Sequence, residues 1–355
     1  MKIVIVGAGV LGAALAQTLA RHGRAVTLVE QYEPGHARAA SDARSRILRM
    51  AHGADVQETR SASLARRLWL ELERDTGTQL FSEVGMTWFA PAGDSAWEEA
   101  GRELLTEEGI ATERLSPAET ARLFPSLCTH DLDHILFEPH AGLLRPREAV
   151  RALVRDATAA GAEIVPGHAT PAGERVALDE QRLEADRIVW ACGAWTPHLF
   201  PDLVHGTVIQ QDVFYFDAPG RWATPPLPAW GEWRKNATGA GDFLGSGFKV
   251  GVDAPGPPFD PDTGVRQPLR DHEAHARAYL STRFPAIATA PLVRTETCQT
   301  VVLDPALPEP AALLGGGVRA LRHPEHDHVW LLGDGSGHAF KHAPAIAVET
   351  ESLLA

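Results

Sequence analysis

The chain is short of cysteine and of positive charge. Its 355 residues include three cysteines, too few and odd in number for a disulfide-stapled fold, so at least one thiol is left for another use. Lysine and arginine total 33 against 46 aspartates and glutamates, a formal net charge of −13. That balance argues against nucleic acid or an anionic membrane surface as the main partner. The 44% hydrophobic and 22% charged residues are typical of a globular protein, and the length suits about two domains.

Long uncharged runs are also lacking, with one exception near the N-terminus. Residues 3–20 carry no charge, a pattern that would suit a signal peptide or a membrane span. Gly7, Gly9 and Gly12 interrupt this stretch in a pattern that has its own mechanism, and Arg21 follows where a cleaved signal would be ending. We therefore expect no membrane partner and, given the cysteine usage, a cytoplasmic protein.

The interrupted stretch has the order strand, glycine turn, helix, strand, acid. Ile3–Val6 and Ala25–Val29 are β-branched runs typical of buried parallel strands, and Gly7–Gly12 directly follows the first of them. Such glycines allow a tight turn and a close approach of a pyrophosphate to the N-terminus of the next helix. Glu30 is placed to accept from a ribose, which disfavours the 2′-phosphate of NADP. The motif predicts dinucleotide binding but does not separate FAD from NAD.

Helical and extended patterns alternate along the rest of the chain. Helices are predicted over 56–77, 95–109, 116–123, 147–161, 272–284 and 343–354, and strands over 83–89, 163–165, 187–195, 207–216, 243–252 and 329–333. Irregular loops are predicted over 41–54, 219–231 and 305–317. This alternation predicts an α/β fold, α+β overall, in which a Rossmann-like domain is joined by a domain on a mixed or antiparallel sheet.

Several separate segments resemble one enzyme family and occur in its order. They are Gly7–Gly12 with Glu30, Arg46–Arg49, Gly247–Gly251, Cys298, His323–His326 and Ser336–Lys341. Together they resemble the monomeric sarcosine oxidase and N-methyltryptophan oxidase branch of the D-amino-acid-oxidase-like (DAO) flavoproteins, over nearly the whole chain. The resemblance implies a Rossmann-like FAD-binding domain from 1–80, 140–206 and 290–355, interleaved with a substrate domain from 81–139 and 207–289.

The resemblance also implies a reaction. In this family, hydride leaves the carbon beside the nitrogen of an amine or amino acid for flavin N5, and dioxygen reoxidises the flavin to give hydrogen peroxide. The implied partners are a small amine or amino acid with a carboxylate and dioxygen, and the protein is expected to be a monomer. The alternatives are a dehydrogenase or biosynthetic tailoring enzyme with another electron acceptor, and a degenerate flavin-binding protein without catalysis.

Four side chains match the family's catalytic positions. Arg49 and Lys341 match residues that hold the substrate carboxylate, the guanidinium through two parallel hydrogen bonds and the ammonium as a point charge. Lys249 matches a lysine that activates dioxygen beside the flavin, and His338 matches a histidine beside flavin and substrate. Each has a plainer interpretation from pattern alone: an arginine of a solvated loop, an outward-facing lysine on a strand, or a histidine that satisfies backbone groups where a helix begins.

A wider set of residues matches flavin contacts in the family. They are Gly7, Gly9, Val10, Leu11, Gly12, Glu30, Ser41, Arg46, Ala191, Gly193, Trp195, Cys298, Gly333, Asp334, Gly337, His338, Ala339 and Lys341. Cys298 matches the cysteine that carries flavin through a thioether, and an ordinary packing role for a free thiol is the alternative. Asp334 resembles the ribityl-binding acid of the broader FAD superfamily, although close oxidase relatives usually lack an acid there.

The substrate side departs from the family pattern. Asp253 stands where sarcosine oxidases typically carry a histidine, and residues 238–244 are rich in glycine and alanine where relatives place tyrosines. Trp222, Trp230 and Trp233 cluster in the preceding predicted loop. These departures predict a different substrate with the same cofactor, and Asp253 either pairs with a cationic substrate or caps a turn.

No metal site is expected from the sequence. His323, His326 and His328 do not have a known metal-ligand spacing and have no cysteine nearby. The segment that holds them recurs in the resembled family as a turn before a strand. Nothing resembles a nucleophile elbow or a phosphate-binding P-loop.

Overall fold

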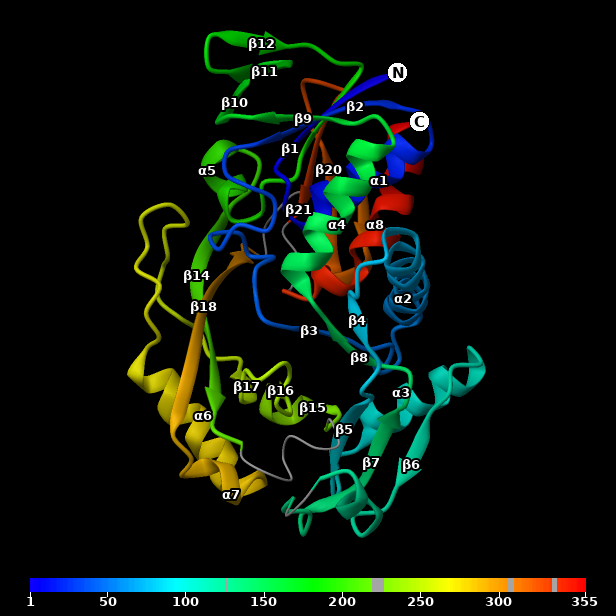
Figure 1. The fold of residues 1–355 in the computed structure, drawn as a ribbon, viewed down its shortest axis with the longest axis vertical. Coiled ribbons are helices and arrows are strands. Elements are labelled where there is room, and N and C mark those ends of the chain that lie inside the picture. The colour runs from blue at the N-terminus through cyan, green and yellow to red at the C-terminus, as the bar shows by residue number, and fades with distance from the viewer. Residues whose placement is uncertain (125–126, 219–226, 305–309, 334–336) are drawn as a thin grey trace.

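Two large β-sheets organise the chain (Figure 1). The computed structural model describes residues 1–124, 127–218, 227–304, 310–333 and 337–355. In Figure 1 a seven-stranded sheet lies in the upper part of the molecule, with both chain termini, and an eight-stranded sheet lies below it. The predicted α/β fold class, with a Rossmann-like part and a mixed sheet, is confirmed.

The seven-stranded sheet has a parallel core. Its strands, in spatial order, are β19 (Ala312–Leu314), β20 (Val318–Arg322), β21 (Val329–Gly333), β13 (Arg187–Trp190), β1 (Lys2–Val6), β2 (Ala25–Glu30) and β9 (Glu163–Pro166). Neighbours from β21 to β9 are parallel, whereas β19, β20 and β21 pair in antiparallel fashion. Ile3, Val4 and Ile5 are fully buried, as the unbroken apolar run of β1 predicts.

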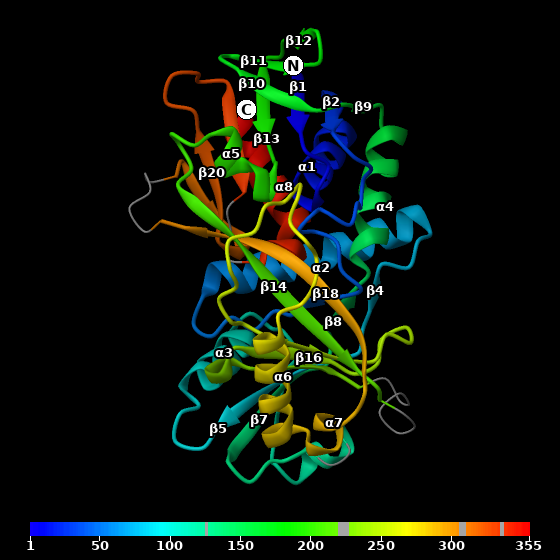
Figure 2. The same ribbon diagram turned by 90° about the vertical axis from the view of Figure 1, so that its left-hand side faces the viewer.

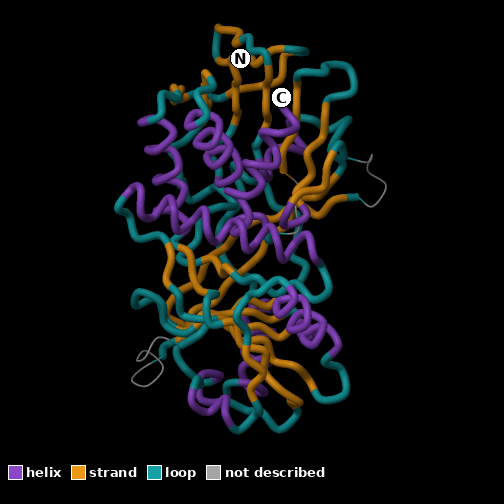
Figure 3. The backbone as a smooth tube through the Cα atoms, turned by 90° about the vertical axis from the view of Figure 1, so that its right-hand side faces the viewer, coloured by secondary structure: helices purple, strands orange, loops and turns teal. Residues whose placement is uncertain are grey.

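Four helices pack beside this sheet. They are α1 (Val10–Arg21), α2 (Val56–Thr76), α4 (Pro146–Ala159) and α8 (Ala339–Leu354). Helix α1 packs against both α4 and α8, and α2 packs against α8. Figure 3 shows a group of helices in the upper half of the molecule, beside strands. The start of α2 is fixed by the Asp55 side chain, which accepts from the Glu58 N–H, and its end by Gly77 in the left-handed region. These helices bring α8, and with it the predicted residues of the C-terminal motif, beside the glycine turn.

The eight-stranded sheet is mostly antiparallel. Its strands, in spatial order, are β18 (Leu292–Leu303), β14 (Gly206–Phe216), β17 (Phe248–Val252), β16 (Ala237–Ala240), β15 (Ala229–Glu232), β5 (Met86–Pro91), β7 (Leu132–Glu138) and β6 (Glu113–Leu115). Only the β15–β5 pair is parallel. The long strands β14 and β18 run together from the upper to the lower part of the molecule (Figure 2).

An aromatic core supports the lower sheet. Trp230 is fully buried, and its ring stacks on Phe89, Phe248 and Tyr279 at centroid distances of 6.3, 5.9 and 5.4 Å. Tyr279 comes from α6 (Arg270–Arg283), which is followed by α7 (Pro285–Ala288). Burial of these rings fixes the sheet that carries the predicted Lys249 and Cys298.

Smaller elements join the two sheets or lie at their edges. One three-stranded sheet has the order β3 (Arg46–Leu48), β8 (Gly142–Leu144), β4 (Phe81–Ser82), and another has the order β10 (Ala169–Ala172), β11 (Arg175–Leu178), β12 (Gln181–Leu183). The shorter helices include α3 (Ala96–Glu107) and α5 (Thr196–Leu199). Turns of 3₁₀ helix lie at Glu119–Arg122, Gly193–Trp195, Trp233–Lys235 and Gly315–Gly317. Strand β3 contains the predicted Arg46, and Arg49 follows it directly.

Some predictions of local structure were wrong. The expected loops 41–54, 219–231 and 305–317 contain the strands β3, β15 and β19, while residues 219–226 and 305–309 lie outside the described part. In β15, Gly231 lies so close to Trp88 that a Cβ would come within 2.5 Å of its ring, so glycine here reflects close strand packing.

The predicted helix over 116–123 is only a 3₁₀ turn. Its capping box does form: Ser116 N–H donates to the Glu119 carboxylate at 2.8 Å, and Glu119 N–H donates to Ser116 Oγ at 3.3 Å. Pro125 follows in the sequence and disfavours helical conformation at the residue before it. The capping box therefore marks a helix start correctly, but too few residues follow it to form an α-helix.

The twelve-residue strand β18 carries Cys298 and was not predicted. It lies within the segment 290–355 assigned to the FAD-binding domain, yet it pairs with β14 of the eight-stranded sheet. The domain boundaries therefore remain a proposal. Among the helices of the described residues, none is long and apolar enough to cross a membrane.

Candidate active site

The turn between β1 and α1 is built from glycines that no other residue could replace without movement. Gly7 has φ +100°, and a Cβ on it would lie 2.6 Å from the Ala191 carbonyl oxygen. A Cβ on Gly12 would lie 1.9 Å from the Gly7 carbonyl oxygen. Gly9 is the N-cap of α1 and offers no side chain, while Val10 N–H donates to Ser41 Oγ at 2.9 Å. The turn leaves bare backbone at a helix N-terminus, which fits a pyrophosphate.

Glu30 contacts this turn, and Trp195 lies near Tyr32, two residues after Glu30. The Glu30 carboxylate accepts from Ala8 N–H at 2.6 Å and from Tyr32 N–H at 2.9 Å, so it faces the turn as predicted. The Trp195 ring lies 6.4 Å from that of Tyr32, and its Nε1 is buried with no hydrogen-bond partner in the described part of the chain. Gly193, with φ +51°, lies at the start of the turn that carries Trp195. A buried indole donor without a partner, close to Tyr32 and to the segment that Glu30 ends, fits a bound dinucleotide.

One face of the eight-stranded sheet carries the predicted Lys249 and Cys298. Tyr215 on β14 pairs with Lys249 on β17, and Gln211 pairs with Cys298 on β18. Because directly paired residues share a face and residues two apart on a strand also share it, these four side chains project to the same side. Glu296, two residues before Cys298, belongs to that face as well.

Lys249 is a buried cation with unusual surroundings. It is 9% exposed, and its Nζ donates to the Ser45 carbonyl oxygen at 2.7 Å and lies 3.2 Å from Ser45 Oγ. Burial, and then the charge of Arg46, lower the pKa of Lys249 to about 8, whereas Glu296 and Cys298 act to raise it. The interpretation of Lys249 as an outward-facing lysine is therefore wrong.

Arg46 connects this sheet face to the loop before β3. Its Nη2 donates to the Ala40 carbonyl oxygen at 2.7 Å and lies 3.7 Å from Cys298 Sγ. The Arg46 Nε is buried without a hydrogen-bond partner among the described residues. Cys298 is half-buried and is not in a disulfide. The structure thus brings together Ser41, Arg46 and Cys298, which were predicted from distant parts of the chain.

Arg49 is held by residues of the eight-stranded sheet. It is 6% exposed, it donates to the Ala51 carbonyl oxygen, and its guanidinium carbon lies 4.7 Å from the Trp88 ring centroid. Glu138 accepts from Met50 N–H at 2.7 Å, from Ala51 N–H at 3.0 Å and from Trp88 Nε1 at 3.0 Å. Burial lowers the pKa of Arg49 to about 10, and the Glu138 charge acts against that shift. The surrounding sheet therefore fixes the guanidinium, so this arginine does not belong to a solvated loop.

Lys341 and His338 lie at the start of α8. Lys341 is 3% exposed, its Nζ lies 3.4 Å from the His338 carbonyl oxygen, and its own carbonyl oxygen accepts from Trp69 Nε1 at 2.9 Å. Burial and the Arg49 charge lower the pKa of Lys341 well below its usual value. Desolvation by the surrounding protein, then Lys341 and Arg49, lower the pKa of His338 to about 3. The His338 side chain is solvent-exposed, so water screens part of the effect of the two cations.

A further polar cluster beside Lys341 was missed by the sequence analysis. His342 is fully buried, with Nδ1 3.1 Å from Ser61 Oγ and Nε2 3.1 Å from the Glu58 carboxylate. Glu58 also accepts from the N–H groups of Gly316 and Gly317 at 2.9 and 3.1 Å. Its residues come from α2, α8 and the turn after β19, so no local motif pointed to them.

This cluster has the residue types of a metal site but an unfavourable charge environment. His52, Glu58 and His342 offer donor atoms within 4.8 Å of one another. Burial, Arg49 and Lys341 all lower the pKa of His52, which shows that the same two cations act on the cluster. Two fixed positive charges at this place oppose a divalent cation.

The remaining predicted residues have mixed outcomes. Gly337 and Ala339 adjoin the start of α8 and Gly333 ends β21, whereas Asp334 and Trp222 lie outside the described residues. Trp230 is a core residue of β15, and Trp233 stacks on Trp97 at 4.9 Å with 39% exposure. Asp253 is exposed and accepts from Gln211 Nε2 at 2.6 Å. His323 and His326 stack on each other at 4.6 Å in a turn.

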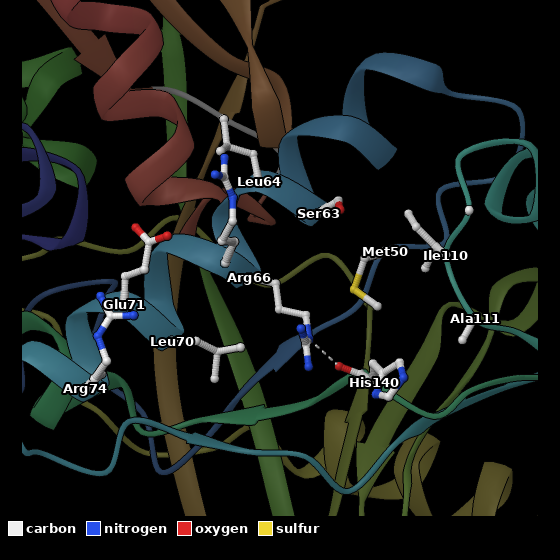
Figure 4. Close-up of a pocket in the computed structure, with 12 residues that line it drawn as sticks. Met50, Ser63, Leu64, Arg66, Leu70, Glu71, Arg74, Ile110, Ala111 and His140 are labelled. Carbon is white, nitrogen blue, oxygen red and sulfur yellow. Dashed lines mark hydrogen bonds between the residues drawn. The ribbon is translucent and has the colours of Figure 1, made fainter.

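A separate cavity of about 750 Å³ opens beside α2 (Figure 4). It is lined by the exposed side of α2 and by residues 109–111, and it includes Arg66, Arg67, Arg74 and His140. Arg66 Nε donates to the His140 carbonyl oxygen at 2.7 Å across it. None of the predicted site residues lines this cavity, so we do not assign the reaction to it.

Arg49, Lys249 and Lys341 share one property that decides what the site can bind. Within the described part of the chain, none of the three takes part in an ion pair within 4.0 Å, although each is at most 9% exposed. The chain has only four lysines, and two of them are these buried ones. Buried cations without ion-pair partners call for anionic ligands.

Comparison with known proteins identifies the family. The model of the FAD dependent oxidoreductase family (DAO) matches residues 2–353. The chain belongs to this family. It is 28% identical to the monomeric sarcosine oxidase of Bacillus sp. (strain B-0618), over 99% of this chain and 91% of that protein. The resemblance drawn from the sequence is thereby confirmed.

Solved structures show the same fold. The L-proline dehydrogenase from P. horikoshii superposes with a TM-score of 0.78 at 18% identity, over 98% of this chain and 91% of that one. The glycine oxidase from Geobacillus kaustophilus superposes with a TM-score of 0.77 at 19% identity, over 99% and 94%. The protein is an FAD-dependent oxidoreductase of the sarcosine oxidase type, and the turn, Glu30 and Trp195 geometry fits its cofactor.

Proposed function

We propose that the protein oxidises the C–N bond of an amine or amino acid that carries a carboxylate, with dioxygen as the electron acceptor. When bound, FAD supplies the redox chemistry: it takes a hydride from the carbon beside the nitrogen, and its electrons pass on to dioxygen, which becomes hydrogen peroxide. The observation that carries the proposal is the set of three buried cations without ion-pair partners in the described chain, Arg49, Lys249 and Lys341.

Arg49 and Lys341 would bind the substrate carboxylate. The Arg49 guanidinium is fixed between Trp88 and the Ala51 carbonyl, so its remaining donors are already oriented before substrate arrives. Lys341 is buried within electrostatic reach of Arg49, and a carboxylate between them would relieve their mutual repulsion. The exposed His338 would border the same space and contact substrate and cofactor.

The cofactor would be held by residues from four segments. The Gly7–Gly12 turn and α1 would bind the pyrophosphate, Glu30 the ribose, and Arg46 and the start of α8 the isoalloxazine. The helix dipole of α8 would favour negative charge on the reduced ring. Cys298 would carry the flavin through a thioether, because its thiol lies on the same sheet face as Lys249.

Lys249 favours an oxidase over a dehydrogenase. Its ammonium is anchored by Ser45 and buried on the sheet face that holds Cys298, where it would stabilise the negative charge that develops on dioxygen. A dehydrogenase with another acceptor has no need of this buried cation and remains the alternative.

The test begins with purified protein reconstituted with FAD. We expect peroxide release with at least one member of a panel of N-methyl and primary amino acids, and none with the corresponding amides, which lack the carboxylate. Reduction of the flavin without peroxide, with electrons passed to an artificial acceptor, would instead support the dehydrogenase. Colourless protein that does not take up FAD would contradict the proposal altogether.

A further inference from the structure

We infer that Glu296 is a positioning residue that supplies the negative charge facing the buried Lys249 ammonium and fixes the 44–46 segment around it. The inference deepens the proposed function, because the role of Lys249 rests on that function. Glu296 matches none of the residues predicted from the sequence, and it lies two residues before Cys298 on the same strand.

The hydrogen bonds of Glu296 show that its carboxylate is built into the site. Tyr215 OH donates to one carboxylate oxygen at 2.7 Å, and Arg44 N–H donates to the other at 3.0 Å. Tyr215 is 1% exposed, and burial together with Glu296 raises its pKa, so its hydroxyl stays protonated as a donor. Two hydrogen-bond donors therefore hold the carboxylate in a fixed position.

Glu296 and Lys249 clamp the same short segment. Glu296 accepts from the backbone of Arg44, and Lys249 donates to the carbonyl oxygen of the next residue, Ser45. Tyr215 pairs with Lys249 across β14 and β17, and its hydroxyl bonds to Glu296, so Tyr215 lies between the two on the same sheet face. The segment then continues into Arg46, whose Nη2 lies 3.7 Å from Cys298 Sγ.

The charged groups around Lys249 have opposite effects on its protonation. Arg46 on β3 opposes a protonated Lys249, while Glu296 and Cys298 on β18 favour it. A cysteine joined to flavin has no thiol to ionise, so in that state the balance against Arg46 falls to Glu296. A cation that stabilises developing negative charge on dioxygen acts only while it is protonated, and Glu296 keeps it so at higher pH.

Lysine scarcity allows a direct test that does not depend on activity. With four lysines in the chain, protein labelled with ¹³C at lysine Cε gives four titrating signals, and Lys249→Met identifies the one from Lys249. We expect its titration midpoint to fall by about one pH unit in Glu296→Gln, which keeps one of the two acceptor oxygens but removes the charge. Glu296→Asp should restore most of the shift. Glu107→Gln, at an exposed position on α3, controls for the change in net charge.

The same variants are then followed in flavin kinetics. Above pH 8, reoxidation of the reduced protein by dioxygen should slow about tenfold in Glu296→Gln, with flavin reduction by substrate within twofold of wild type. A Lys249 midpoint equal in wild type, Glu296→Gln and Glu107→Gln would overturn the inference. If Glu296→Gln does not fold, Glu296→Ala decides by the same midpoint. The Lys249 midpoint could differ between wild type and Glu296→Gln as expected while wild type releases no peroxide. That result would contradict the proposed function but support the charge pairing of Glu296 with Lys249.

Discussion

The Arg49 guanidinium lies 4.7 Å above the ring of Trp88, while the indole N–H of that ring donates to Glu138. Glu138 also binds the two N–H groups that follow Arg49, so one buried carboxylate aligns both the arginine's backbone and the surface on which its side chain rests. The arginine is thus positioned by a strand pair, β5 and β7, of the eight-stranded sheet. The proposed carboxylate-binding group is therefore fixed by the eight-stranded sheet.

Trp88→Phe keeps an aromatic surface but removes the bond to Glu138 and weakens the cation–π contact. Losing about 1 kcal/mol of positioning should raise KM about fivefold and leave kcat within twofold, because the group acts through Arg49 and not on the reacting bond. Trp233→Phe, whose ring stacks on Trp97 at the surface, is the control. An unchanged KM in Trp88→Phe, measured with the substrate found in the panel, would show that Trp88 does not position Arg49.

Arg49→Lys keeps the positive charge but cannot form two parallel hydrogen bonds to a carboxylate. We expect KM to rise about 100-fold, which corresponds to about 3 kcal/mol. Arg67→Lys, at an exposed position on α2, should be indistinguishable from wild type. Equal KM values in Arg49→Lys and wild type would mean that Arg49 does not hold the carboxylate.

Substrate binding should be coupled to proton uptake at Lys341. Its pKa is lowered in the free protein, chiefly by burial and then by Arg49, and a bound carboxylate would raise it again. Between the free-state pKa and the higher bound-state pKa, affinity should therefore fall about tenfold per pH unit, and binding should take up a proton. Calorimetry in two buffers of different ionisation enthalpy measures that uptake. Lys341→Gln should show none, and a wild-type enthalpy independent of the buffer would refute the coupling.

Stability should rise with pH because of Lys249. Its pKa is about 8 in the folded chain against an ordinary value of 10.5, so the unfolded chain holds this proton more tightly between those two values. The buried Lys249 ammonium therefore destabilises the fold, fully below pH 8 and no longer above pH 10.5. The free energy of unfolding should change by up to about 3 kcal/mol across this range. Urea denaturation of the apoprotein at several pH values measures it. In Lys249→Met this contribution should vanish, whereas the same slope in both proteins would place the effect elsewhere.

Cys298→Ala tests the thioether. Wild-type protein precipitated with acid should stay yellow, while the Cys298→Ala precipitate should be colourless and its supernatant should contain the flavin. Cys192→Ala, at a half-buried position after β13, is the matched control. Free flavin released from both proteins would show non-covalent binding.

The sequence predicted the parts of the site that are local in the chain. The glycine turn, Glu30 and the α8 motif each lie within one or two elements, where steric and helix-end rules apply directly. It did not predict the partners that the topology brings in: Glu138 from β7, Glu296 from β18, and Glu58 on α2 against His342 on α8. Those contacts depend on strand order and helix packing, which hydrophobic periodicity does not encode.

Element boundaries failed for physical reasons as well. Strand β15 was taken for a loop because glycine and proline dominate its surroundings, yet it pairs in parallel with β5 and buries Trp230 completely. Packing against an aromatic core overrode local propensity there.

Anaerobic mixing followed by dioxygen tests the central claim most directly. Reconstituted protein is mixed with the active N-methyl or primary amino acid without dioxygen, and then with dissolved dioxygen, while the flavin absorbance is followed. We predict complete bleaching, then full recovery with one hydrogen peroxide released per flavin. Absorbance that does not bleach with any carboxylate-bearing amine, or bleaches and does not recover with dioxygen, would contradict an FAD-dependent amine oxidase.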